Sequence, residues 1–126
     1  MTGFEEVVAS ELTWLLRAGA SSRALRLSVR ELVDARIERG PLGAHEIHDA
    51  VEAAMRAACR LVRESGAPAE LVDIVCGAAL EAVRGHGGES ARWLPEATST
   101  ARAVLVEVRE EGGDVSAWSW IDRRWR

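Results

Sequence analysis

AHEIHDAVEAAMRAACRLVRES, residues 44–65, decides the fold, because its apolar side chains recur at helical spacing throughout. The side chains of this stripe are Ile47, Val51, Ala54, Ala58, Leu61 and Val62. Positions three, four and seven apart share one face of a helix, so the pattern predicts an amphipathic helix that buries this stripe. Much of the face is alanine, which allows neighbouring helices to pack closely against it.

Two further helices are predicted before this stretch. The first begins at a capping box formed by Thr2 and Glu5 and ends at Gly19, because glycine adopts the left-handed conformation that closes a helix. The second is capped by Ser21 or Ser22. Their apolar stripes consist of Phe4, Val8, Leu12, Leu15 and Leu16, and of Leu25, Val29, Leu32, Val33 and Ile37.

More helices are predicted after it. One spans about residues 69–84, the next begins at Ser90 or Pro95 and ends at Glu111, and residues 116–124 form a short last helix. The fold class is therefore all-α: a compact bundle of five to six helices, mostly antiparallel because the connections are short.

The C-terminal half contains a degenerate helical repeat. The string V-R-x-x-G-small begins at Val62, Val83 and Val108, and the last two copies extend to G-G-acid-x-small-x-W. Each copy places arginine near the negative end of a helix dipole and then breaks the helix with glycine. Such periodicity is typical of stacked helical units, and we predict a single helical domain over residues 1–126. Its repeat-like units are about 57–66, 67–88 and 89–126.

Charge and composition exclude several classes of function. The net charge of −4 provides no general basic field, so nucleic acid is not an expected partner. No apolar stretch approaches the roughly 20 residues of a membrane span, and acids stand at the start where a signal peptide is basic. We expect a cytoplasmic protein. Catalytic and nucleotide-binding motifs are missing from the sequence, so we expect no enzymatic activity and no cofactor.

The two cysteines, Cys59 and Cys76, are too far apart in sequence for a zinc motif or a redox C-x-x-C motif. Both fall inside predicted helices. We predict that they are small buried hydrophobic side chains.

Four polar residues share a face of the helix over residues 44–65. His45, His48, Asp49 and Glu52 are three, four and seven residues apart, opposite the buried stripe. Imidazole and carboxylate together suit a divalent transition metal, which makes a metal-binding bundle one alternative function. The ordinary alternative is a solvated helix face, since one helix rarely supplies a closed metal site.

The same residues support a second alternative. The string from Ala44 to Val51, A-H-E-I-H-D-A-V, resembles the phosphoacceptor box of one histidine-kinase dimerisation family, A-R-E-[IL]-H-D-x-[VL]. The resemblance implies that His48 accepts a phosphoryl group and that Asp49 acts as its base. His45 stands where the family has arginine. The chain lacks asparagine, so the asparagine box of the ATP-binding domain is missing and the resemblance implies a relay or dimerisation module.

Arginines gather in the predicted second helix and just before it. Arg17, Arg23, Arg26 and Arg30 follow one another with no acid between them. The favoured interpretation is that they pair with acids of a neighbouring helix or of another subunit. The alternative is that they bind a phosphate or carboxylate group.

Tryptophan and arginine are concentrated at the C-terminus: Trp118, Trp120, Arg123, Arg124, Trp125 and Arg126. Both residue types are enriched at the energetic centres of interfaces. We predict a protein interface in this segment or, equally well supported, a tryptophan cap on the helical core with solvated arginines.

The favoured function is a small non-enzymatic helical protein for interaction or regulation, acting as a homo-oligomer. This prediction rests on apolar residues beyond one stripe per helix, which typically mark a contact surface. The surplus side chains are Trp14, Leu15, Leu16, Val104, Leu105, Val106 and Val108.

Overall fold

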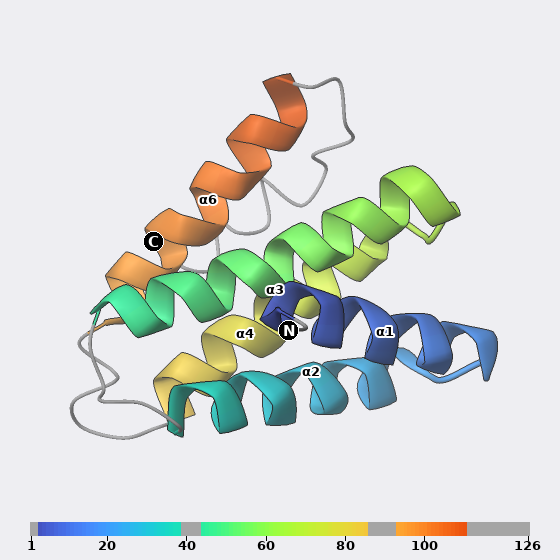
Figure 1. The fold of residues 1–126 in the computed structure, drawn as a ribbon, viewed down its shortest axis with the longest axis horizontal. Coiled ribbons are helices and arrows are strands. Elements are labelled where there is room, and N and C mark those ends of the chain that lie inside the picture. Colours follow the sequence, from blue (N-terminus) through green and yellow to red (C-terminus); the bar gives the residue numbers. More distant parts are fainter. Residues whose placement is uncertain (1–2, 39–43, 86–92, 111–126) are drawn as a thin grey trace.

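The computed structural model describes residues 3–38, 44–85 and 93–110, and these residues are all-helical with no strand (Figure 1). The helices are α1 (Phe4–Arg17), α2 (Ser22–Glu38), α3 (Ala44–Ser65), α4 (Glu70–Gly85) and α6 (Leu94–Glu110). The predicted all-α class is confirmed. Helices α1 to α4 alternate in direction, as short connections favour, and α6 is inclined to them.

Helix α1 begins one residue later than its sequence predicts. Its N-cap is Gly3 rather than the predicted Thr2, in an extended conformation and without a side-chain cap. Thr2 lies outside the described residues, and Glu5 binds an arginine of α3 instead. Glycine has no side-chain oxygen to accept the first N–H groups, and the Glu5 carboxylate is engaged in a tertiary contact.

The end of α1 follows the prediction. Gly19 has a φ of +74°, the left-handed conformation. Its N–H donates to the carbonyl of Leu16 at 3.2 Å, and the N–H of Ala20 donates to that of Leu15 at 3.0 Å. These two bonds form a Schellman motif, which satisfies carbonyls at the helix end and turns the chain into α2.

Helix α2 starts at the predicted cap. The Ser21 hydroxyl accepts the N–H of Ala24 at 3.2 Å. Its buried side chains are Leu25, Val29, Val33 and Ile37, while Leu32 is half-buried against the same core. The predicted stripe is therefore the face that packs on α1, α3 and α4.

Helices α3 and α4 form the centre of the bundle. Helix α3 packs against α1, α2, α4 and α6, and five of its six predicted stripe residues are buried, with Val62 half-buried. Helix α4 buries a nearly continuous run from Val75 to Val83 between α2, α3 and α6. Gly77, Ala78 and Ala79 lie within this run, and their small size allows the helix to be enclosed on several sides.

The prediction that the apolar side chains of α6 are surplus to the core is wrong for most of them. Val104, Leu105 and Val108 are buried in the core, and only Val106 of that group is exposed, at 39%. Helix α6 contacts both α3 and α4, so it buries a wider face than a single stripe. Its apolar run therefore fills the core of this chain.

The repeat stays a prediction. Gly66 ends α3 with a φ of +69°, as its place in the first copy requires. Helix α4 already ends at Gly85, two residues before the second repeat glycine. That glycine, the third copy's Gly112 and the predicted last helix over residues 116–124 lie outside the described residues.

Candidate functional site

His48 joins α3 to α6. Its Nδ1 atom lies 2.9 Å from the hydroxyl oxygen of Thr100, and its Nε2 atom lies 2.9 Å from a carboxylate oxygen of Glu52. Its side chain is 45% exposed, whereas Thr100 is buried. Both ring nitrogens are therefore engaged although solvent reaches the ring.

The two partners of the imidazole differ in chemistry. The Thr100 hydroxyl lies 2.9 Å from Nδ1 of His48 and also 3.0 Å from the carbonyl of Glu96. A carboxylate only accepts, so Glu52 accepts Nε2–H of His48.

A polar ladder continues from this histidine along the seam between α3 and α6. The second carboxylate oxygen of Glu52 accepts a hydrogen bond from Nε–H of Arg56 at 3.3 Å. The Nη2 atom of Arg56 donates to Glu107 at 2.6 Å. The bond to Glu107, assisted by Glu52, raises the pKa of Arg56 above its ordinary value despite partial burial. We call His48, Glu52 and Arg56 with Thr100 and Glu107 the α3–α6 ladder.

Of the predicted phosphoacceptor and metal-site residues, the ladder brings His48 and Glu52 together. Asp49 is exposed, and the side chain of His45 lies outside the described residues. Within the described part of the chain, no group of three or more His, Cys, Asp or Glu residues is placed to hold a metal ion. The metal-site and phosphoacceptor assignments stay predictions.

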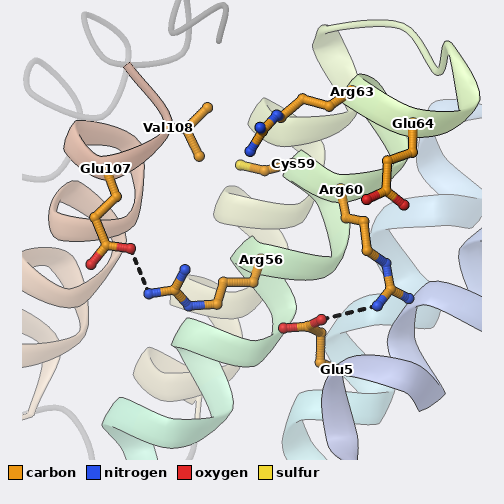
Figure 2. A pocket seen from close by; sticks show the side chains of 8 residues that line it. All are labelled: Glu5, Arg56, Cys59, Arg60, Arg63, Glu64, Glu107 and Val108. Carbon is orange, nitrogen blue, oxygen red and sulfur yellow. Dashed lines mark hydrogen bonds and ion pairs between the residues drawn. The ribbon is translucent and has the colours of Figure 1, made fainter. Parts of the chain in front are cut away.

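A hollow of about 400 Å³ lies beside the ladder, between α1, α3 and α6 (Figure 2). Three arginines of α3 line it: Arg56, Arg60 and Arg63. Glu5 of α1 and Glu107 of α6 face them from either side, and Glu64, Cys59 and Val108 complete the lining. The hollow thus combines cations and anions in close succession.

Arg60 ties α3 to the first turn of α1. It donates to Glu5 at 3.1 Å and to both oxygens of Glu6, at 2.6 and 3.2 Å. The bond and charge of Arg60 lower the pKa of Glu6, and Glu6 in turn raises the pKa of Arg60. Arg60 and Arg56 therefore hold the two outer helices, α1 and α6, to the central one.

The two cysteines are buried, as predicted, with 5% of Cys59 and 1% of Cys76 exposed. Burial, with added contributions from the negative charge of Asp73 and from Cys59, raises the pKa of Cys76 to about 12. A thiol with this pKa stays protonated at neutral pH, so Cys76 is not a nucleophile.

Sequence reasoning missed this hollow and the α3–α6 ladder. The available signal was the spacing of Arg56, Arg60 and Arg63, which places three guanidinium groups along one edge of α3. The partners of Arg56 and Arg60 outside α3 are acids of α6 and α1, 51 to 55 residues away along the chain. Spacing within one helix contains no information about such partners.

The two most exposed large apolar side chains of the described residues belong to α1 and α2. Trp14 is 65% exposed and Leu27 is 55% exposed, and Val7 is exposed at 39%. Leu15 and Leu16, which the sequence grouped with Trp14, are instead half-buried against the core.

The four arginines of the α1–α2 hairpin differ in their partners. Arg26 of α2 forms a two-pronged ion pair with Glu81 of α4, as predicted for a neighbouring helix. A guanidinium nitrogen of Arg30 lies close to Gly85, at the C-terminal end of α4. Arg17 and Arg23 are exposed.

The C-terminal tryptophans and arginines, from Trp118 to Arg126, lie outside the described residues, and their interface stays a prediction. None of the described helices combines the length and apolar character that crossing a bilayer requires. No protein-family model matches the chain, and searches of curated proteins and of solved structures found no match.

Proposed function

We propose that this chain is a non-enzymatic helical interaction module that acts as a homo-oligomer. The observation that carries the proposal is the exposure of Trp14 on α1 together with Leu27 on α2. Exposed apolar patches mark association surfaces, and tryptophan is enriched at their energetic centres.

Each of the two side chains lies on a different part of the surface. Trp14 lies beside a hollow between α1 and α3, lined also by Thr13, Arg60 and Leu61. Leu27 is exposed on α2, next to Arg26, which pairs with Glu81 of α4. Each is tested separately below.

The polar groups of the hollow and the α3–α6 ladder fit a structural role. Arg56 and Arg60 are engaged with carboxylates of α6 and α1, and His48 is engaged at both nitrogens. Because these groups are already paired across helices, they stabilise the packing of the helices against one another. This supports a module whose function lies on its surface.

Light scattering over a range of concentrations tests the proposal. We expect a mass above the 13.7 kDa of one chain, and a weaker association in Trp14→Ser and in Leu27→Ser. Val106→Ser removes an exposed valine from α6 and is the matched control, expected to leave association unchanged. A monomeric protein at several hundred micromolar overturns the proposal, and equal association in all variants overturns the assignment to these residues.

Phosphotransfer through His48, with Asp49 as base, has less support because both ring nitrogens already have partners. Incubation with phosphoramidate, a small phosphoryl donor, tests it. We expect no acid-labile phosphate on the folded protein. A label that disappears in His48→Gln favours the relay function over ours.

A further inference from the structure

One ridge of α2 carries a self-complementary set of side chains. Arg23, Leu27 and Glu31 follow one another at intervals of four residues, so they lie on one ridge of the helix. All three are exposed. We call them the Leu27 ridge.

The two charges of this ridge are unused within the described part of the chain. Neither Arg23 nor Glu31 makes an ion pair or hydrogen bond there. Arg26 of the same helix, in contrast, is paired with Glu81 of α4. The charge of α2 that lies beside α4 is therefore matched within the bundle, whereas those of Arg23 and Glu31 are available to a partner.

The order of the ridge has a geometric consequence. Leu27 lies midway between a cation and an anion at equal spacing. When two identical ridges meet antiparallel, with a two-fold axis at Leu27, the cation of each ridge faces the anion of the other. The contact therefore contains two pairs of opposite charges. A two-fold contact uses the same surface on both subunits, and this ridge meets that requirement with no further residues.

The arrangement of the ridge also matches the usual anatomy of an interface. Leu27 is 55% exposed at its centre, and the charges of Arg23 and Glu31 lie at its two ends. Apolar side chains at the centre and charges at the rim form the usual arrangement of an interface.

We propose that the occupant of this face is a second copy of the chain, bound antiparallel along α2. Leu27 packs against Leu27 of the partner subunit, and Arg23 pairs with Glu31 of the partner subunit in both directions. This inference rests on the proposed function, since it requires self-association, and it adds the register and the residues that select the partner.

Charge reversal tests the register. In Arg23→Glu, two like-charged pairs of carboxylates face each other across the axis, and in Glu31→Arg two pairs of guanidinium groups do so. We expect each variant alone to raise the dimer dissociation constant about tenfold or more. An equimolar mixture of the two variants restores opposite charges at both contacts, and we expect it to associate as tightly as the original chain.

Two controls separate a specific contact from a change in net charge. Arg84→Glu and Glu70→Arg reverse exposed charges on α4 and are expected to leave the dissociation constant unchanged. Circular dichroism checks that every variant keeps its helical content.

The possible failures are distinguishable. A monomeric original chain overturns the proposed function and this inference together. A dimer that is indifferent to Arg23→Glu and Glu31→Arg, or a mixture that stays as weak as its components, overturns the register alone and leaves self-association standing.

Discussion

The Nδ1 atom of His48 lies 2.9 Å from the hydroxyl oxygen of Thr100, and this hydrogen bond begins the polar seam between α3 and α6. Thr100 is 4% exposed, so its hydroxyl depends on protein partners. The histidine that most resembled a reactive group in the sequence therefore links two helices here.

Removing the Thr100 hydroxyl tests this role. Thr100→Val keeps the shape of the side chain and is expected to lower the free energy of unfolding by about 1 kcal/mol, because a typical net hydrogen bond is lost. Urea denaturation measures the change. Ser99→Ala removes a hydroxyl from the exposed side of α6 and is expected to be near neutral. Equal effects of the two substitutions contradict the structural role of the bond.

Acid should weaken the tie between α1 and α3. Arg60 holds the pKa of Glu6 below its ordinary value of 4.5. A carboxyl with a lowered pKa binds fewer protons in the folded state than in the unfolded state. Its contribution to stability is therefore present above pH 4.5 and is lost as the pH falls through the lowered pKa.

Comparing Glu6→Gln with the original chain measures this contribution. We expect Glu6→Gln to lower the urea midpoint at neutral pH, and the difference to disappear in strong acid. Molar salt should also reduce it, because the pair is open to solvent. Glu38→Gln, which changes an exposed carboxyl at the end of α2, should not lower stability at either pH. A Glu6→Gln difference that persists in strong acid contradicts the ion-pair explanation.

The helices were predictable because their signals are local. Gly19 and Gly66 both adopt the left-handed conformation at the helix ends where the sequence places them, and Ser21 caps α2 as predicted. Each of these features depends on a few neighbouring residues. The sequence could therefore specify α1 to α4 to within one or two residues.

Contacts between helices were less predictable. Val104 and Leu105 looked like surplus because a helix beside one neighbour buries a single stripe, but α6 lies against both α3 and α4. Likewise, His48 finds its partner 52 residues along the chain. Which helices meet, and in which register, depends on the summed packing of all faces, which no single helix encodes.

Two substitutions of Gly19, in the left-handed turn after α1, should differ in how much stability they cost. Alanine at position 19 has to adopt a φ of +74°, which costs about 1–2 kcal/mol for a residue with a Cβ. Gly19→Ala should therefore lower the free energy of unfolding by about that amount. Asparagine tolerates this conformation better, so Gly19→Asn should cost less. Equal losses for both substitutions, or none, contradict a conformational cause, and thermal or urea melts distinguish these outcomes.

Truncating two adjacent residues of α6 should have very different effects on stability. Leu105 is 1% exposed between helices, so Leu105→Ala should leave a cavity and lower the free energy of unfolding by about 2–5 kcal/mol. Val106 is 39% exposed on the outer face, so Val106→Ala should change it by less than about 0.5 kcal/mol. Urea denaturation measures both, at low concentration so that association does not contribute.

The same pair separates folding from association. If the apolar run of α6 fills the core of one chain, Leu105→Ala destabilises the monomer at every concentration. If the run instead covered a partner, its effect would grow with protein concentration, and Val106→Ala would share it, because an interface stabilises by mass action. We expect the first pattern. A large, concentration-dependent loss in Val106→Ala would place the oligomer contact on α6 and remove the α1–α2 hairpin from that role.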